Sequence, residues 1–487
     1  MAVIGARLAE SAELFPDKKA LITENHSITY CELQQRVERH KGRLKVLMSS
    51  MKGKKVGFML SNDSPFLELF IAISSAGAIA VPFDPKWTEE EFDRVTSYAA
   101  VDFIVYEEGF LSRFPSLRKK GLSWKAFIQV APGKMHAEAN SGDLFYIGFT
   151  SGTTGLPKGY QRTHSSWADC FLYGGRVFSL TKEDHILVPG PLVHSHFLYA
   201  ALQSLHIGAT LSLTSSFNSA LVMDLVKNKK VNVVYIVPTM FEALRSIASF
   251  PFYLKALISS GAKWEASSKA SAARLFPNTA IYDFYGASEL SFVSFQKVGD
   301  QHEEGSIGTL FPLVELQVRR KNGQAAAPDE EGFIYVKSPW IFSGYYHDPV
   351  ATSQVFNDGW VTTGDIGCTT DYGETFLIGR AHNMIISGGL NIYPEEVEKV
   401  IKDVPRVSEA VVVGVPDEYW GEKVVALYKK NGPLNQQELV SRCERTLSSY
   451  KQPKHWIEVD QFPYTSSGKV ARKQVKEAYV NQLGALS

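Results

Sequence analysis

The segment from Thr150 to Tyr160, TSGTTGLPKGY, carries residue types that bind a polyphosphate. Three glycines within eight residues, Gly152 and Gly155 among them, let the backbone approach a ligand and point several N–H groups at it. Lys158 adds a cation, and the hydroxyl donors are Thr150, Ser151, Thr153 and Thr154. The GxxxxGK(S/T) spacing of a Walker A loop fits neither Lys158 nor Lys469. A flexible surface turn is the alternative, but the segment directly follows an apolar run, which favours a phosphate-binding loop.

Short apolar runs separated by helix-length segments must position this loop. Residues 21–110 alternate amphipathic and β-rich segments, and further apolar runs occupy 143–149, 231–238, 254–261 and 279–286. This alternation predicts parallel βαβ units in an α/β fold. Because ligands bind beyond the carboxyl ends of parallel strands, we expect the chemistry where these runs end.

The pattern changes after about residue 300 to short strands separated by glycines, which predicts a β-rich subdomain. Beyond Arg380, the segment 393–404 places Pro394 at a first helical position. An apolar stripe follows on this helix, formed by Val397, Val400, Ile401 and Val404. We therefore expect an α/β protein with a large N-terminal domain, residues 1–380, of parallel α/β sheets plus the β-rich subdomain. A small mobile α+β domain, residues 381–487, would follow.

Composition excludes several classes of protein. The chain has 487 residues, and its 51 Lys plus Arg balance 51 Asp plus Glu, so no basic excess points to a nucleic-acid partner. With 45% hydrophobic and 21% charged residues, the chain is globular rather than disordered. Its four dispersed cysteines favour a reducing cytoplasm over a disulfide framework or a structural zinc site. The apolar stretch 66–83 is interrupted by Glu68 and Pro82, which predicts a buried helix running into a strand rather than a membrane span.

The loop TSGTTGLPKG resembles the signature loop of the adenylate-forming superfamily, which includes acyl- and aryl-CoA synthetases, luciferases and peptide-synthetase adenylation domains. Other family motifs follow in order, and the resemblance covers essentially the whole chain. Residues 285–289, YGASE, resemble the YGxTE motif with Ser288 in place of threonine. The resemblance implies that Tyr285, beside Gly286, stacks on adenine and that Ser288 contacts phosphate. It also implies that Glu289, with Thr150, holds Mg²⁺. Alone, this segment would more often be a solvated turn.

The segment WVTTGD, residues 360–365, resembles the W-x-x-TGD motif. The resemblance implies that Asp365 accepts hydrogen bonds from both ribose hydroxyls; a turn cap is the alternative for this aspartate. Arg380 would contact the ribose as well. His382 would stand at the domain hinge, where the family usually has Asp or Lys. The neighbouring glycines that would border the pantetheine tunnel are Gly388 and Gly389.

The tail PYTSSGKVAR, residues 463–472, resembles the PxTxxGKxxR motif. The resemblance implies that Lys469 enters the site and neutralises charge on the substrate carboxylate and the α-phosphate. Trp420 and Lys451 occupy positions where CoA synthetases often contact the CoA nucleotide, although Gln452 replaces a usual basic residue. For Trp420, packing in the domain is an equal alternative.

These motifs together imply an ATP-dependent, AMP-forming acyl-CoA synthetase that uses ATP, Mg²⁺ and coenzyme A. A carboxylate attacks the α-phosphorus of ATP to give acyl-AMP and pyrophosphate, and a thiol then displaces AMP. Both reactants of the first step are anionic, so positioning and charge neutralisation dominate its barrier. The residues expected at the reacting centre are Lys469, Thr150, Glu289 and His194.

The acid is the least determined partner. Residues 189–199, PGPLVHSHFLY, resemble the family's PLxHxxG segment, with His194 in its usual place. Phe197 replaces the usual glycine, and it either narrows the acyl pocket or is a core aromatic. No acidic side chain lies in 186–200 to bind an α-ammonium group, so we expect a fatty or other non-amino carboxylic acid. The alternative acceptor is the phosphopantetheine of an acyl carrier protein. A third hypothesis is a nucleotide-binding protein that has lost catalysis, which the retained Lys469 and Asp365 disfavour.

Overall fold

The computed structural model describes residues 2–48, 50–134, 139–150, 158–228, 231–248, 251–387, 390–417, 420–465 and 468–480. The chain divides into two compact units. The large unit comprises Met1–Gln301, Thr309–Glu315 and Lys337–Val361, and the small unit comprises His302–Gly308, Leu316–Val336 and Thr362–Ser487. Each unit combines helices with sheets, which confirms the predicted α/β class. The predicted domain boundary after residue 380 stays a prediction.

One sheet of the large unit leads into the predicted phosphate loop. Its seven strands, in spatial order, are β18 (Gly344–Tyr345), β8 (Lys158–Thr163), β7 (Leu144–Thr150), β4 (Ile79–Pro82), β3 (Lys55–Met59), β5 (Phe103–Tyr106) and β6 (Leu122–Ser123). The pairs from β7 to β6 are parallel, whereas β8 is antiparallel to both β7 and β18. The loop therefore joins the two strands of an antiparallel hairpin at the side of a parallel sheet.

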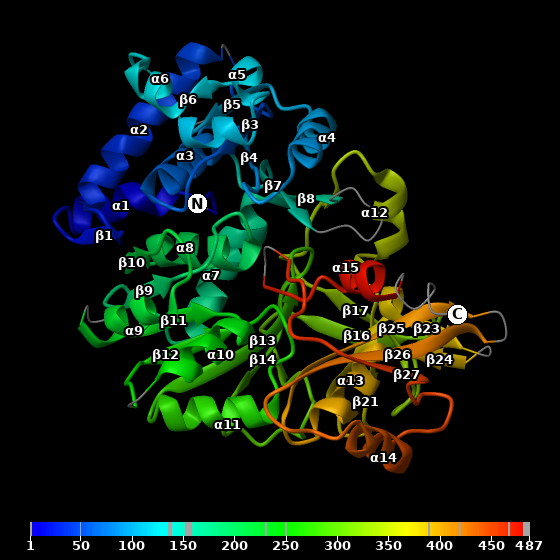
Figure 1. Ribbon diagram of the computed structural model, residues 1–487. Coiled ribbons are helices and arrows are strands. Elements are labelled where there is room, and N and C mark those ends of the chain that lie inside the picture. The colour runs from blue at the N-terminus through cyan, green and yellow to red at the C-terminus, as the bar shows by residue number, and fades with distance from the viewer. Residues whose placement is uncertain are drawn as a thin grey trace. The chain divides into compact units, whose positions relative to one another are not determined.

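A second sheet of the large unit carries the other predicted strand exits (Figure 1). Its nine strands, in spatial order, are β15 (Thr309–Leu310), β14 (Ser291–Lys297), β13 (Ala280–Ala287), β12 (Ala256–Ser259), β11 (Val233–Ile236), β9 (His185–Val188), β10 (Thr210–Leu213), β1 (Lys19–Ile22) and β2 (Ser27–Thr29). The strands β11, β12 and β13 are parallel, as the apolar runs predict. β11, β12 and the start of β13 are buried, and side chains from all three pack with Phe241 and Trp264 in one apolar core.

The helices of the large unit lie between these strands in the chain, as a βαβ pattern requires. They are α1 (Ala6–Leu14), α2 (Tyr30–Leu47), α3 (Ser64–Ser75), α4 (Glu89–Ala99), the 3₁₀ helix η1 (Glu108–Ser112), α5 (Leu117–Lys120), α6 (Trp124–Gln129), α7 (His164–Val177), α8 (Ser195–His206), α9 (Ser219–Asn228), α10 (Pro238–Ile247), α11 (Ala266–Leu275) and α12 (Pro349–Val355). A short hairpin, β19 (Phe356–Asn357) and β20 (Trp360–Val361), ends the unit.

The apolar stretch 66–83 forms most of α3 and then β4, which confirms the predicted buried helix running into a strand. Asp63 caps the helix by accepting a hydrogen bond from the Ser64 N–H, and nearly every residue of α3 is buried because the helix is apolar on all sides. Within the described ranges, no helix is both long and apolar enough to cross a membrane.

The small unit is built from two further groups of strands. β16 (Glu315–Arg319), β17 (Gly332–Lys337), β21 (Asp365–Thr369) and β22 (Thr375–Arg380) share one sheet. The other sheet has the order β24 (Leu390–Ile392), β23 (Ile385–Ser387), β26 (Gly421–Lys430) and β25 (Val407–Asp417), with β27 (His455–Glu458) on β26. The helices are η2 (Ala381–Asn383), α13 (Pro394–Lys402), α14 (Gln436–Thr446), α15 (Arg472–Val475) and the π-helix η3 (Lys476–Val480).

Both faces of the β25–β26 sheet are buried. The predicted stripe on α13 and the segment after it is buried against one face together with Val412 and Leu439. The other face carries Val411 and Val413, which pack with Phe462 and Val475. This alternation follows from the two-residue period of a strand, and it makes the sheet a fixed support for the loops at its ends.

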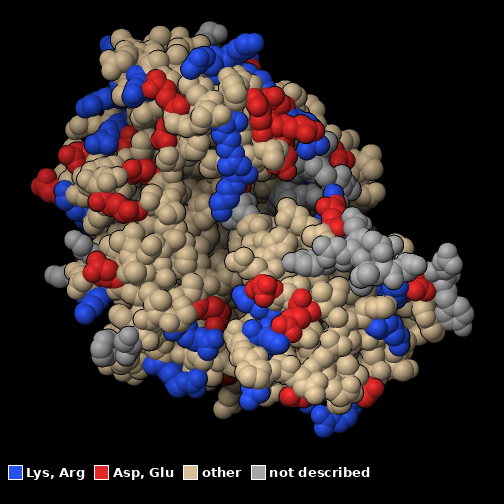
Figure 2. All heavy atoms as spheres, viewed as in Figure 1, with Lys and Arg blue, Asp and Glu red and all other residues tan. Residues whose placement is uncertain are grey.

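Charged side chains of both signs are interspersed on the face of the molecule drawn in Figure 2, with no broad basic area on it. This distribution agrees with the balance of 51 basic and 51 acidic residues in the sequence.

Candidate active site

The predicted phosphate loop leaves β7 and returns in β8, with Thr150 paired to Lys158 across the hairpin. The strands therefore hold the two ends of the loop together. The predicted phosphate-binding residues Ser151, Gly152, Thr153, Thr154 and Gly155 lie outside the described residues, as does the side chain of Thr150. Among the predicted phosphate-binding side chains of this segment, the structure places that of Lys158, the cation at the end of the loop.

The YGASE segment makes a tight connection between β13 and β14. A Cβ on Gly286 would lie 2.2 Å from the carbonyl oxygen of Ser291, so this position requires glycine. The carbonyl of Glu289 accepts hydrogen bonds from the Phe342 N–H at 2.7 Å and from Arg162 Nη1 at 3.4 Å. Glu289 itself is only 9% exposed. The segment is thus a hydrogen-bonded connection that is half-buried from Tyr285 to Ser288 and buried at Glu289, rather than a fully solvated turn.

Ser288 contacts the segment that resembles PLxHxxG. Its Oγ lies 2.9 Å from Oγ of Ser195, the first residue of α8, directly after His194. The Tyr160 side chain of β8 lies close enough to both serines for them to influence its pKa, which burial raises, so its hydroxyl stays protonated. The structure therefore brings together three segments that sequence motifs identify separately: the strand after the phosphate loop, the YGASE segment and the predicted acyl segment.

Tyr345 contacts two of the predicted charged residues and was missed by sequence reasoning. Its hydroxyl donates a hydrogen bond to Oε1 of Glu289 at 3.0 Å, and Nζ of Lys158 lies 5.0 Å from the centre of its ring. Burial and the neighbouring Glu289 raise the pKa of Tyr345 well above its ordinary range. The signal that could have found it is the segment FSGYYHDP, which carries a pair of tyrosines beside a glycine but little charge.

Arg162 is a second residue that sequence reasoning missed. It is fully buried in β8, and burial lowers the pKa of its guanidinium to about 10. Within the described part of the chain, its Nε and Nη2 have no hydrogen-bond partner, while its guanidinium lies 5.9 Å from the ring centre of Trp167. The Glu289 carboxylate is among the groups whose charge opposes this lowering of the Arg162 pKa.

The donor set at Glu289 fits Mg²⁺. The described residues contain no cluster of three or more His, Cys, Asp and Glu side chains that would form an all-protein metal site. Tyr345 donates to Oε1 of Glu289, which leaves both lone pairs of Oε2 available to a cation. Mg²⁺ is typically held by one or two carboxylates together with substrate phosphates and water. One carboxylate that shares its neighbour Tyr345 with the cation Lys158 suits such a donor set.

Phe197 is a core residue in the structure. It is 2% exposed and its ring lies 4.7 Å from that of His196, measured between ring centres. A Cβ on Gly190 would lie 2.1 Å from the Phe197 ring, so the ring fills the space above this glycine. Of the two alternatives for Phe197, the structure thus supports the core aromatic.

In the small unit, the predicted ribose-binding pair is in contact. Asp365 and Arg380 face each other in the β21–β22 register, and Arg380 Nε donates to Oδ1 of Asp365 at 2.8 Å. Thr363 Oγ1 donates to the other carboxylate oxygen at 2.9 Å. Asp365 is buried, whereas 41% of the Arg380 side chain is exposed. The two donors, Arg380 Nε and Thr363 Oγ1, together fix the plane of the Asp365 carboxylate.

Lys469 lies exposed at a turn. Thr465 N–H donates to the carbonyl of Lys469 at 2.7 Å, and Gly468 adopts a positive φ of 81°, a conformation that favours glycine. Tyr464 and Val470, which flank this turn, form an isolated antiparallel β-bridge. The turn therefore presents the lysine side chain away from the core of the small unit.

The remaining predicted residues of the small unit have different surroundings. Trp420 is 44% exposed, so it is not a core residue of this unit. Lys451 forms an ion pair with Glu396 in the first turn of α13, with Nζ to Oε1 at 2.7 Å. Gly388 and Gly389 lie outside the described residues, as does the side chain of His382.

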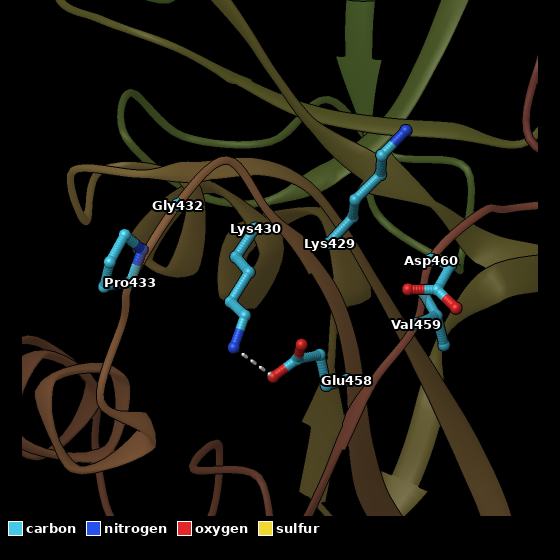
Figure 3. Close-up of a pocket in the computed structure, with 7 residues that line it drawn as sticks. All are labelled: Lys429, Lys430, Gly432, Pro433, Glu458, Val459 and Asp460. Carbon is cyan, nitrogen blue, oxygen red and sulfur yellow. Dashed lines mark ion pairs between the residues drawn. The ribbon is translucent and has the colours of Figure 1, made fainter.

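A hollow of about 360 Å³ on the small unit contains none of the predicted residues (Figure 3). Lys430 and Glu458 form an ion pair across it at 2.9 Å. The full set of lining residues is Lys429, Lys430, Gly432, Pro433, Glu458, Val459 and Asp460. Since Lys430 and Glu458 pair with each other and Lys429 pairs with Glu409, we assign the hollow no role.

Comparison with known proteins identifies two family regions. Residues 8–346 match the model described as AMP-binding enzyme, and residues 396–469 match the model described as AMP-binding enzyme C-terminal domain. The chain is 38% identical to the uncharacterized acyl–CoA ligase YhfT of Bacillus subtilis, over 96% of this chain and 97% of that protein. It is 30% identical to 2-succinylbenzoate–CoA ligase of Bacillus velezensis, over 98% of both chains.

Solved structures agree with this assignment. The o-succinylbenzoate CoA synthetase MenE of Bacillus subtilis, in complex with the acyl-adenylate intermediate OSB-AMP, superposes with a TM-score of 0.88 at 27% identity, over 96% of this chain and 97% of that one. The same enzyme in complex with ATP and magnesium ion gives a TM-score of 0.86 at 26% identity, over 96% and 98%. The chain therefore belongs to the AMP-binding enzyme family and is an adenylate-forming acyl-CoA ligase.

Proposed function

We propose that this ligase activates a carboxylic acid that lacks an α-amino group, aliphatic or aryl, and transfers its acyl group to coenzyme A. The observation that carries this proposal is the 2.9 Å contact between Oγ of Ser288 and Oγ of Ser195. Ser288 belongs to the predicted phosphate-contacting segment, and Ser195 lies within the predicted acyl segment as the first residue of α8. An acid bound at one segment would thus meet an α-phosphate bound at the other, as acyl-adenylate formation requires.

In the first half-reaction, an oxygen of the substrate carboxylate forms a bond to the α-phosphorus, and the bond from that phosphorus to pyrophosphate breaks. Lys158 and the N–H groups of the loop bind phosphate oxygens, and Ser288 adds a hydroxyl donor. Mg²⁺, when bound at Glu289, neutralises phosphate charge. Lys469 neutralises the charge of the attacking carboxylate and the α-phosphate.

The nucleoside is held by residues of different character. Tyr285 stacks on adenine beside Gly286, and Asp365 accepts hydrogen bonds from the ribose hydroxyls. Arg380, which donates to Oδ1 of Asp365, orients that carboxylate. An ionised carboxylate suits this task because it only accepts hydrogen bonds, whereas the ribose hydroxyls can donate them.

In the second half-reaction, the CoA thiolate attacks the acyl carbon and AMP leaves. The family motifs assign Gly388, Gly389, Trp420 and Lys451 to the thiol side, and His194 to the acyl side. A CoA phosphate would have to replace Glu396 as the partner of Lys451. The domain rotation that the resemblance implies would withdraw Lys469 between the two steps.

The acid itself is proposed from what the predicted acyl segment lacks. Residues 186–200 contain no carboxylate to pair with an α-ammonium group. Relatives of this chain are named for long chain fatty acids, 2-succinylbenzoate and ferulate, all of which are acids without an amino group. A role in fatty-acid metabolism and a location in the cytoplasm are part of this proposal.

A pyrophosphate-release screen tests it, with short, medium, long and aromatic acids, each with and without CoA. We expect acid-dependent release, and thioester formation with free CoA. Thioester formation only with a phosphopantetheinylated carrier protein would instead identify a loading enzyme. Absence of acid-dependent ATP–pyrophosphate exchange over the whole panel would contradict adenylation by this chain.

A further inference from the structure

Tyr345 connects the two charged groups of the large unit that the Mg²⁺–ATP proposal uses. Lys158 and Glu289 are 131 positions apart in the sequence, yet each contacts the same side chain. The ammonium of Lys158 lies over the ring face, and the carboxylate of Glu289 takes the hydroxyl proton in a hydrogen bond. One neutral side chain therefore partners both opposite charges.

The backbone around Tyr345 fixes it in this place. Tyr345 pairs with Tyr160 in the β18–β8 ladder, and its N–H donates to Oγ1 of Thr352 at 2.9 Å. The Phe342 ring lies 5.0 Å from the Tyr345 ring, and the Phe342 N–H binds the carbonyl of Glu289. Tyr345 and Glu289 are thus held to each other through the backbone as well as through the hydroxyl.

The hydroxyl determines how the carboxylate can bind a cation. Among the described residues, Tyr345 is the one hydrogen-bond donor to this carboxylate, and it uses Oε1. This hydrogen bond uses one lone pair of Oε1 and leaves both lone pairs of Oε2 available, which favours Oε2 as a monodentate ligand. Mg²⁺ demands compact octahedral geometry and takes monodentate carboxylates, whereas the larger Ca²⁺ accepts bidentate ones.

The ring has a separate effect. A direct ion pair between Lys158 and Glu289 would neutralise both groups before a nucleotide bound. Tyr345 offers each of them a neutral partner, since a cation is attracted to the face of a phenol ring and a carboxylate to its hydroxyl. The ring and its hydroxyl therefore give Lys158 and Glu289 separate contacts on one neutral side chain.

We propose that Tyr345 is a positioning residue that makes Glu289 a monodentate, Mg²⁺-selective ligand and keeps Lys158 apart from it. This role rests on the proposed binding of Mg²⁺–ATP at Glu289. It goes beyond that function by assigning metal selectivity to a residue that itself touches neither the metal nor the acid.

The test measures metal binding directly, with the full chain and a non-hydrolysable ATP analogue. Mn²⁺ binding is followed by electron paramagnetic resonance, and Mg²⁺ and Ca²⁺ are titrated as competitors. The variant Tyr345→Phe removes only the hydroxyl, and Tyr345→Leu also removes the ring. The matched control is Tyr346→Phe, because the neighbouring hydroxyl binds the carbonyl of Ala99 and Nζ of Lys55 instead.

For Tyr345→Phe we expect Mg²⁺ affinity to fall about tenfold and the Ca²⁺-to-Mg²⁺ affinity ratio to rise, while affinity for the metal-free analogue stays unchanged. For Tyr345→Leu we expect affinity for the metal-free analogue to fall as well. A Tyr345→Phe variant whose metal affinities and selectivity match those of Tyr346→Phe would overturn the proposal. Failure of the unaltered chain to bind any metal–analogue complex would overturn the nucleotide site itself, and the role of Tyr345 with it.

Discussion

In the large unit, Glu289 is 9% exposed, and its carboxylate and carbonyl contact side-chain or backbone groups from distant segments. In the small unit, Lys469 lies exposed on a turn closed by its own neighbours. The two residues thus have opposite surroundings, although both are predicted to stabilise the same adenylation step. A buried, many-sided support suits a group that must stay in place, and an exposed turn suits a group that must enter a site and leave it.

Lys469→Ala is the change that tests this contrast with the largest effect. Because Lys469 is assigned to the adenylation step alone, we expect acid-dependent ATP–pyrophosphate exchange to fall on the order of 1,000-fold. Thioester formation from supplied acyl-AMP should be nearly unchanged. The control is Lys473→Ala, another exposed lysine of the same unit, whose partner is Glu477. Equal loss of both steps in Lys469→Ala would contradict a lysine that serves only the first step.

Glu289→Gln tests the other side of the contrast. The amide keeps the shape of the side chain but removes its charge, so we expect the adenylation rate to fall on the order of 100-fold at saturating ATP. Raising the Mg²⁺ concentration should recover part of this loss, which the initial rate of pyrophosphate release would show. A variant with the rate and Mg²⁺ dependence of the unaltered chain would show that Glu289 is a structural carboxylate.

Asp365→Asn should have a smaller effect, confined to the nucleotide. Asparagine retains one acceptor but loses the charge that Arg380 pairs with at 2.8 Å. We expect KM for ATP to rise about tenfold, with KM for the acid unchanged. 2′-Deoxy-ATP provides a matching comparison. Replacing ATP with this nucleotide should lower the affinity of the variant by less than it lowers the affinity of the unaltered chain. Equal losses would remove Asp365 from the ribose site.

Gly148→Ala tests the packing around Tyr160, a neighbour of Ser288, through the stability of the protein rather than its catalytic rate. A Cβ at this glycine would lie 2.2 Å from the Tyr160 hydroxyl and 2.3 Å from the Tyr146 hydroxyl, which themselves hydrogen-bond at 2.8 Å. Overpacking there should cost about 1–3 kcal/mol of unfolding free energy, visible in denaturant unfolding. Gly175→Ala in α7 is the control, since its Cβ would meet nothing within 4 Å. Similar stability of the two variants would show that the hydroxyl pair has room to move.

The smallest expected effect is a pH dependence of the stability of the large unit. Burial lowers the pKa of His164 to about 4 from 6.5, and its Nδ1 accepts a hydrogen bond from the Ile4 N–H, which requires the neutral ring. The unfolded chain therefore binds a proton that the folded chain does not, so stability is full above about pH 6.5 and falls as the pH drops toward 4. We expect unfolding of the large unit to respond in this window, and His164→Gln to flatten the response. A slope that persists in this variant would assign it to other groups, such as His206, whose pKa is also lowered to about 4.

The sequence predicted the parts of the molecule that local pattern encodes. The apolar runs became β7, β11, β12 and β13, and the stretch 66–83 became α3 and β4, because burial on both sides of a central strand requires continuous apolar residues. The stripe on α13 is buried as its helical spacing requires. The motif order, rather than any single motif, predicted the family.

The contacts around Tyr345 and Arg162 could not be read from the sequence. Tyr345 meets Glu289 and Lys158 only because β18 pairs with β8, which comes about 180 residues earlier in the chain, and no periodicity encodes such a pairing. Arg162 follows the phosphate loop in a strand whose neighbours gave no sign that it would be fully buried. Phe197 stayed open between two alternatives because only the fold shows that its ring covers Gly190.

The path of the carboxylate oxygen tests the central claim most directly. The acid that supports the fastest pyrophosphate release would be labelled with ¹⁸O in both carboxylate oxygens and turned over with ATP, Mg²⁺ and CoA. If the carboxylate attacks the α-phosphorus and the thiol then attacks the acyl carbon, each AMP molecule should carry one ¹⁸O atom in its phosphate. AMP without label, or label in inorganic phosphate, would contradict the acyl-adenylate route.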